Sequence, residues 1–258
     1  MEIQKELGPG GGGWVTDLIT KHIDEKAQAS ANYKRKWRIR PSEIGECTRK
    51  IVYSILNFPT ETVPDARVQR IFQNGHHVRD RYLADYLPKI GIPCKVWVQK
   101  RGVWKFINFI EVMLEEKDLW LRGSPDAIIF NPQTGQKYVF ELKSMNQEEF
   151  WKLEEPVESH VYQAHLYMYM TKVHKAILLY ENKNRQDIKE FEIDYDPEII
   201  NFLIRKIRKI QKCVRAFAHV MEIPDREYNA KKCSYCPYAY RPTGCLSDWK
   251  KKRRKKIS

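Results

Sequence analysis

Residues 123–130 (GSPDAIIF) and 138–143 (YVFELK) are the two segments of this chain that decide its fold. Each is a short apolar run of strand-forming residues, and the turn residues NPQTG at positions 131–135 separate them, which predicts a β-hairpin. The hairpin would bring Asp126, at the start of the first strand, close to Glu141 in the second. Lys143 lies two residues after Glu141, so on a strand both side chains point to the same face. The sequence therefore predicts two carboxylates and one ammonium group at one end of a hairpin.

These residue types suit the binding of a divalent cation and the hydrolysis of a phosphodiester. Mg²⁺ takes oxygen ligands in near-octahedral geometry, and Asp126, Glu141 and the carbonyl group of Leu142 offer three of them. A bound metal ion lowers the pKa of a coordinated water and neutralises charge that develops on the phosphate. We expect Lys143 to orient that water or to stabilise the transition state. Mg²⁺ or Mn²⁺ is therefore the expected catalytic cofactor.

The order of these motifs resembles that of a known nuclease superfamily. Residues 125–126 (PD), followed after fourteen residues by residues 141–143 (ELK), look like the signature of the PD-(D/E)XK superfamily. Further along, Gln163 and Tyr167 match the Gln-x3-Tyr pattern of its RecB-like branch, and on a helix this spacing puts both side chains on one face. The resemblance implies an α/β fold of the restriction-endonuclease type, with a mixed central sheet flanked by helices. It also implies catalytic roles for Asp126, Glu141, Lys143, Gln163 and Tyr167.

Three of the six cysteines have the spacing of metal ligands. They are Cys233, Cys236 and Cys245, and Cys47, far upstream, is the candidate for the fourth ligand. This arrangement is similar to that of the iron–sulfur RecB-like exonucleases, which include the CRISPR-associated Cas-four-type enzymes and the AddB nuclease. The resemblance implies a 4Fe–4S cluster that staples a C-terminal cap to the early part of the domain. Four cysteines bind zinc equally well, so the spacing leaves zinc open as an alternative. The two remaining cysteines are expected to be buried, Cys94 on a strand and Cys213 on a helix.

One position departs from the family pattern. RecB-like nucleases often carry a metal-ligating histidine four residues after a glycine on an upstream helix, whereas Arg79 occupies that position after Gly75. The neighbouring His76 and His77 are the candidate metal ligands in its place. His76 lies one turn before Arg79, and His77 is rotated from His76 by about 100° on an ideal helix. The sequence does not choose between them, and a site without a histidine ligand stays open.

The charge of the chain favours nucleic acid as a partner. The formal net charge is +13, and seven of these positive charges lie in an uninterrupted run over residues 250–256; subtracting them leaves +6 on the remainder. A basic surface binds nucleic acid by releasing counterions from phosphates. We interpret the run as a DNA tether, with a solubilising disordered end or a nuclear-localisation-like patch as alternatives. The expected DNA-binding residues are Arg49, Arg79, Lys250, Lys251, Lys252, Arg253, Arg254, Lys255 and Lys256.

A chain of 258 residues is expected to form one main domain with appended ends. Its parts are a flexible lead at 1–13, a nuclease core at 14–224, a cysteine-rich cap at 225–249 that closes on Cys47, and a basic tail at 250–258. No apolar run is long enough to cross a membrane, and no charged-then-apolar leader is present. We therefore expect an intracellular protein, in the cytoplasm or nucleoid, or in the nucleus or a viral factory of a eukaryotic host.

Periodicity and turn signals predict the individual elements. Helices are expected over 14–31, 42–57 (with Ser42 as its N-cap), 66–87, 147–154, 158–171 and 197–220. Strands are expected over 94–100, 109–115, 118–122, 126–130, 137–143, 174–181 and 188–193.

Together these observations predict a metal-dependent deoxyribonuclease. We expect an exonuclease that acts on single-stranded or frayed DNA ends, and additional endonuclease activity stays open. Recombination, repair, phage or viral DNA processing and CRISPR spacer acquisition are settings that fit. Two alternatives stay open. The chain has no Gly-x4-Gly-Lys-Ser/Thr motor motif, so it could lend a nuclease domain to a larger helicase or integrase assembly. It could also be a zinc-stapled DNA-binding protein without cleavage of its own.

Overall fold

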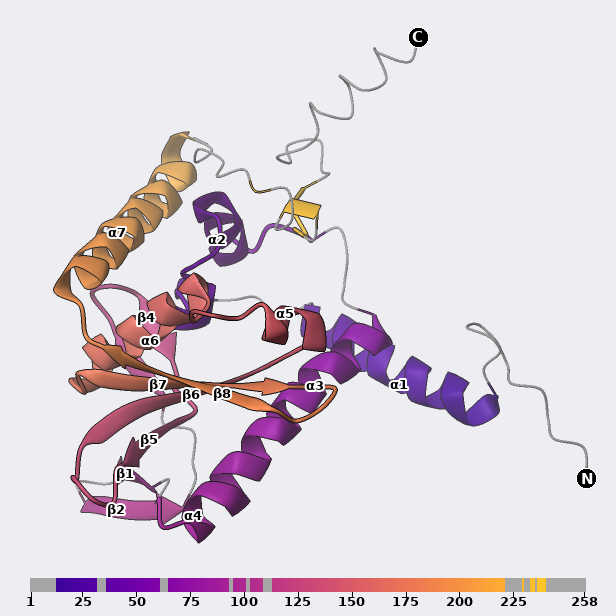
Figure 1. The fold of residues 1–258 in the computed structure, drawn as a ribbon. Coiled ribbons are helices and arrows are strands. Elements are labelled where there is room, and N and C mark those ends of the chain that lie inside the picture. The colour runs from indigo at the N-terminus through magenta and orange to yellow at the C-terminus, as the bar shows by residue number, and fades with distance from the viewer. Residues whose placement is uncertain are drawn as a thin grey trace, which may run out of the picture.

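A computed structural model describes residues 13–31, 36–60, 65–92, 95–100, 103–108 and 113–220, together with 229, 233–234 and 236–239. Figure 1 shows these elements gathered around a central sheet. In chain order they are α1 (Trp14–Ala31), η1 (Pro41–Glu43), α2 (Thr48–Ile55), α3 (Ala66–Arg81), η2 (Tyr82–Tyr86), α4 (Leu87–Lys89), β1 (Lys95–Lys100), β2 (Val103–Asn108), β3 (Leu114–Glu116), β4 (Leu121–Gly123), β5 (Ala127–Phe130), β6 (Lys137–Met145), α5 (Gln147–Trp151), α6 (Glu158–Thr171), β7 (Lys175–Asn182), β8 (Ile188–Asp194) and α7 (Pro197–Val220).

The central sheet has the strand order β5-β6-β7-β8. β5 and β6 form the predicted hairpin, in which Ala127 pairs with Phe140, and β7 pairs antiparallel with β8. β6 and β7 run parallel, so the chain between them must cross over, and it does so through α5 and α6. The crossover places α6 directly over the strand that carries Glu141.

Helices cover both faces of this sheet, because successive side chains of a strand alternate between its faces. Phe140 and Leu142 of β6 pack in one apolar cluster with the helical run α3–η2–α4. Val139 of β6 packs in another cluster with α5 and α6. Figure 1 shows α3 on one side of the sheet and α5 and α6 on the other. The predicted mixed sheet flanked by helices is thus confirmed. Glu141 has the same parity as Val139, so its side chain points towards α6.

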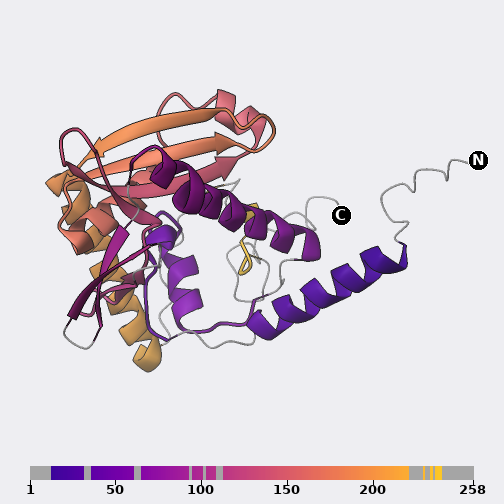
Figure 2. The ribbon, with the colours of Figure 1, turned by 90° about the horizontal axis from the view of Figure 1, so that it is seen from below.

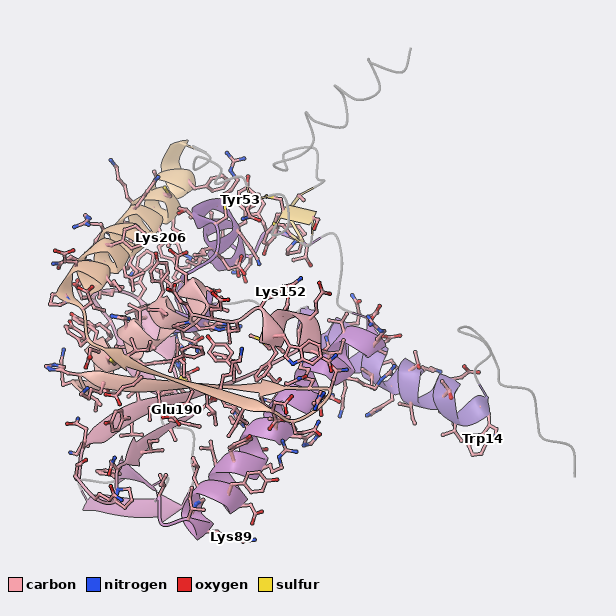
Figure 3. All side chains as sticks on the ribbon, in the orientation of Figure 1. Trp14, Tyr53, Lys89, Lys152, Glu190 and Lys206 are labelled. Atoms are coloured by element: carbon pink, nitrogen blue, oxygen red, sulfur yellow. The ribbon has the colours of Figure 1, made fainter. Side chains whose placement is uncertain are left out.

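A further layer lies outside α6. Ile51, Val52 and Ile55 of α2 form a buried cluster with the apolar stripe of α7, and Leu166 of α6 joins it. Cys213 lies on α7 as predicted and packs against this cluster, but it is half-buried where a buried cysteine was expected. The described part of the C-terminal segment reaches the same region, because the ring of Tyr238 lies 5.5 Å from the ring of Tyr53 on α2. Tyr53 is labelled in Figure 3 on this helix.

The second predicted helix, 42–57, is interrupted. Ser42 lies inside the short turn η1, and α2 begins only at Thr48, with Cys47 as its N-cap. The break between η1 and α2 lies close to α6: a Cβ atom on Gly45 would lie 2.5 Å from the Cβ of Ser159. The backbone at Gly45 therefore lies flush against α6, with no room for a side chain.

Two predicted strands agree only in part with the structure. Most of the strand expected at 109–115 lies outside the described residues, and its last two residues belong to β3. β2 was not predicted; it pairs antiparallel with β1, with Lys100 opposite Val103. The strand expected at 118–122 is shortened to β4, since residues 117–120 form a turn in which Trp120 has a φ of 56°. The other predicted helices and strands agree with the structure to within a few residues at their ends.

α1 is the element least integrated into the body. It contacts α3 and projects outward from there in both Figure 1 and Figure 2. Trp14, Leu18 and Ile19 are half or more exposed, and Trp14 is labelled in Figure 3 near the start of α1. Among the helices that the structure describes, none combines the length and the hydropathy needed to cross a membrane.

Candidate active site

Asp126 and Glu141 are held together at the open end of the β5–β6 hairpin. The strands pair only as far as Ala127 and Phe140, so the backbone N–H of Leu142 lies beyond the last paired residues. This N–H donates instead to Oδ2 of Asp126, at 2.8 Å. The backbone N–H of Asp126 donates in turn to Oε1 of Glu141, at 3.3 Å. These two bonds fix the carboxylates side by side.

Lys143 and Gln163 complete a polar triangle on Glu141. The Nζ of Lys143 donates to Oε2 of Glu141 at 2.8 Å and to Oε1 of Gln163 at 3.1 Å. The Nε2 of Gln163 donates to the same Oε2 of Glu141, at 2.8 Å. Lys143 and Glu141 come from one strand, and Gln163 comes from α6, which covers this face of the sheet. The predicted juxtaposition of these three side chains is therefore present.

Burial and neighbouring charges determine the pKa values of Glu141 and Lys143. Glu141 is 2% exposed. Burial raises its pKa to about 7, with the positive charge of Lys143 opposing the rise and the negative charge of Asp126 adding to it. Burial lowers the pKa of Lys143, but the two carboxylates outweigh that effect and raise it overall. At neutral pH Lys143 is therefore a cation, and Glu141 is close to its titration point.

The site opens into a cavity of about 1620 Å³, which is lined by Asp126, Glu141, Lys143 and Gln163. Two further features of the lining matter for a ligand. One is a set of cationic side chains, and the other is a pair of exposed apolar side chains on α3, Ile71 and Phe72. The cations are Arg40, Arg67, Arg79, Lys152 and Lys183. Lys152, labelled in Figure 3, lies at the end of α5. Such a cavity attracts polyanions.

Comparison with known proteins gives matches at the level of structure. No family model matches the chain, and no curated protein matches it. The fold is similar to that of SSO0001. That crystal structure has a TM-score of 0.51 and 16% identity, covering 88% of this chain and 94% of its own. An alkaline exonuclease from Laribacter hongkongensis has a TM-score of 0.48 and 14% identity, and the match covers 76% of this chain and 95% of the exonuclease. A phage-related exonuclease from Haemophilus somnus 129PT has a TM-score of 0.43 and 13% identity, and the match covers 75% of this chain and 100% of that exonuclease.

The two candidate histidines are placed differently from each other. His76 lines the cavity and His77 does not, and both side chains are exposed. Arg79 lines the cavity too, with its NH1 4.0 Å from Oδ1 of Asp126 and its NH2 3.0 Å from Oδ1 of Asp80. No three His, Cys, Asp or Glu side chains gather into a metal-holding group anywhere in the described ranges. A histidine ligand therefore stays a prediction.

Two carboxylates and a backbone carbonyl nevertheless fit a hard divalent cation. Asp126 and Glu141 are close enough for the charge of one to raise the pKa of the other. A cation between them would relieve that repulsion. Leu142 belongs to the same cavity wall and carries the third expected oxygen on its carbonyl group.

Two other predicted residues lie away from the cavity. Tyr167 is 3% exposed, and its hydroxyl oxygen would be 2.9 Å from a Cβ placed on Gly123. It supports the segment that leads into Asp126 and does not contribute to the cavity lining. Arg49 is half-buried on α2 and is absent from this lining. The basic run 250–256 lies outside the described residues.

Three of the four predicted cysteine ligands lie in the described residues. Cys47, Cys233 and Cys236 are half-buried, and none of the three forms a disulfide. Cys233 and Cys236 share a turn in which the backbone N–H of Cys236 donates to the carbonyl of Cys233 at 3.3 Å. Cys245 and the buried cysteine expected at position 94 lie outside the described residues.

His160 is a cavity residue that the sequence motifs did not single out. It lies on α6, one turn before Gln163, and it contacts Tyr180 on β7. The spacing of three residues on a predicted helix was a usable signal, because it places His160 on the same face as Gln163. Tyr180 had no such signal, since its position depends on the parallel pairing of β6 with β7.

Proposed function

We propose that this protein is a metal-dependent deoxyribonuclease that hydrolyses phosphodiester bonds near the ends of single-stranded or frayed DNA. The observation that carries the proposal is the position of Lys143. Its Nζ lies 2.8 Å from Oε2 of Glu141, beside Asp126, on the wall of a cavity lined by five further cations. A cation held beside two carboxylates in a basic cavity is suited to phosphodiester hydrolysis.

Each side chain has a role in this proposal. Asp126, Glu141 and the carbonyl of Leu142 would hold Mg²⁺ or Mn²⁺. The ion, when bound, would lower the pKa of a water and neutralise charge on the phosphate. Lys143 orients that water and stabilises the negative charge of the transition state. Gln163 keeps both Glu141 and Lys143 in place through its two hydrogen bonds.

The preference for unpaired DNA rests on the apolar part of the cavity. Phe72 is 55% exposed and Ile71 is 40% exposed, although both line the same cavity as the carboxylates. Exposed aromatic side chains in a basic groove stack with unpaired bases. A base in a duplex is already stacked and paired, so it does not offer its face to Phe72. This favours a substrate with a single-stranded end.

We also propose that Cys47, Cys233, Cys236 and Cys245 hold a structural 4Fe–4S cluster, with zinc as the alternative. The support is the contact of Tyr238 with Tyr53, because it brings the segment after Cys236 to the helix that begins directly after Cys47. Protein purified without oxygen should be brown and contain iron. Colourless protein with stoichiometric zinc would select the alternative.

The deciding experiment is a cleavage assay on end-labelled DNA. Single-stranded oligonucleotides labelled at the 5′ or the 3′ end are incubated with the purified protein and Mn²⁺. Cleavage that disappears in Asp126→Asn and in Lys143→Met supports the proposal, and the two labels give the polarity. Cleavage that persists in both variants points to a contaminating nuclease and refutes it.

A second function is favoured by α1. The helix projects away from the body in Figure 1, and its apolar residues Trp14, Leu18 and Ile19 are half or more exposed, as expected of a helix that binds another protein. In this reading the chain lends its nuclease domain to a helicase or integrase assembly. Native protein that binds DNA tightly but leaves it intact, in the same assay, would favour this function.

A further inference from the structure

His160 is held in a single hydrogen-bonding state by Tyr180. Tyr180 is fully buried, and its hydroxyl oxygen accepts a hydrogen bond from the backbone N–H of Val157 at 3.1 Å. The Nδ1 of His160 lies 3.0 Å from the same oxygen. Among the described residues, this nitrogen is the only acceptor for the hydroxyl proton of Tyr180. The hydroxyl therefore donates to Nδ1, and the proton of the neutral imidazole resides on Nε2.

The imidazole also stays neutral. Burial lowers the pKa of His160 to about 3, and the nearby positive charge of Lys143 adds to that effect. At neutral pH, then, the ring is an uncharged donor that cannot lose its orientation by becoming protonated.

The donor is open to solvent on a residue of the cavity wall, since Nε2 is not among the buried polar atoms that lack a partner. His160 belongs to the cavity lining together with Lys143 and Gln163, and its Nε2 has no hydrogen-bond partner within the described part of the chain. It lies three residues before Gln163 on α6, which is about one helical turn, or about 5 Å along the axis. A group bound to Nε2 is thus displaced by about one turn from the group that reacts beside Glu141.

We propose that the Nε2–H of His160 donates a hydrogen bond to a non-bridging oxygen of the DNA phosphate next to the one that is cleaved. This inference rests on the proposed nuclease function. The phosphate is the appropriate partner because Lys143 lies near His160, and because the cationic residues of the cavity lining outnumber its carboxylates, so the cavity collects anionic oxygens. An uncharged donor fixes the register of the strand without holding the product as tightly as another cation would.

The test compares His160→Ala with His160→Gln, whose side-chain amide retains a donor. Binding to a single-stranded oligonucleotide is measured by fluorescence anisotropy in EDTA, and kcat and KM are measured with Mn²⁺. We expect His160→Ala to lose about tenfold in affinity, the usual contribution of a hydrogen bond to a charged group. His160→Gln should recover most of that loss. Thermal unfolding of both variants shows whether they are folded.

Oligonucleotides with one modified phosphate can show which phosphate His160 contacts. A methylphosphonate, which removes the charge of one phosphate, is placed at each position in turn. Wild-type protein should lose affinity at the position next to the cleaved bond, and folded His160→Ala should no longer respond to that position. Equal responses in the two proteins overturn the role of His160. A ¹⁵N spectrum of histidine-labelled protein that shows the proton of His160 on Nδ1 would also overturn this role. Wild-type protein that neither binds nor cleaves DNA overturns the proposed function itself, which is a distinguishable result.

Discussion

The backbone N–H of Leu142 donates to Oδ2 of Asp126 at 2.8 Å, so the carboxylate that precedes β5 is tied to the strand that carries Glu141. The two acidic groups therefore move as one unit. Lys143 and Gln163 reach that unit through flexible side chains that hydrogen-bond to Glu141, which makes them informative positions for separating chemistry from folding.

Lys143→Met should remove cleavage while preserving the fold. The loss of the ammonium group removes a donor to the transition state, and we expect kcat to fall by about 100-fold or more. The matched control is Lys175→Met on β7, whose lysine pairs with Glu192 and Asp194 at the exposed edge of the sheet. It should cleave at the wild-type rate. An equal loss in both variants would indicate damage to the sheet.

Mn²⁺ binding should release a proton near neutral pH. Glu141 has a pKa of about 7 without metal, so its proton must leave before the carboxylate can bind the ion. Affinity should rise by up to about tenfold per pH unit below pH 7 and level off above it. Isothermal titration calorimetry in buffers of different ionisation enthalpy measures the released proton. A flat profile between pH 5.5 and about 8 would contradict the assignment.

Ionisation of Glu141 should lower the stability of the metal-free protein as the pH rises, although it favours metal binding. The folded state holds the proton of Glu141 more tightly than an unfolded chain, in which the pKa is 4.5. Its contribution is therefore present below pH 4.5 and is lost as the pH rises to about 7. Urea unfolding at several pH values should show this decline in the wild type. Glu141→Gln should lack it, and an unchanged decline in that variant would assign the effect to another group.

Gly45→Ala should destabilise the protein through its contact with α6. The added Cβ would lie 2.5 Å from the Cβ of Ser159, and we expect a loss of about 1–3 kcal/mol in the free energy of unfolding. Ser159→Gly in the same chain removes the opposing atom. The double variant should therefore lose less than the sum of the two single changes. Additive losses in urea unfolding would show that the contact is not tight.

Removing one partner of the Arg81–Glu181 pair should cost more than removing both. Glu181 is buried on β7, and the NH2 of Arg81 lies 2.5 Å from its Oε2. Arg81→Met leaves this carboxylate buried without its cation, and we expect a loss of about 3 kcal/mol. The double change Arg81→Met with Glu181→Leu should recover most of it. Thermal and urea unfolding of the three variants measure the difference.

Local sequence signals predicted the parts of this protein that depend on neighbouring residues. The turn at 131–135 and the flanking strand residues predicted the β5–β6 hairpin, and with it the approach of Asp126 to Glu141. The spacing of Gln163 on a predicted helix indicated a polar residue that could face the site. Contacts between distant segments gave no such signal. Gly45 approaches Ser159, and His160 meets Tyr180, only because the parallel strands β6 and β7 fix where α6 lies.

The parallel pairing of β6 with β7 has a practical meaning for engineering. Arg79 and Phe72 reach the cavity from α3, but the proposed catalytic residues and their orienting partners lie on one uninterrupted piece of polypeptide from Asp126 to Tyr180. New termini opened in loops outside that piece would leave every one of these groups on a continuous backbone. Circular permutation is therefore better tolerated before Asp126 or after β7 than within the β6–α6–β7 unit.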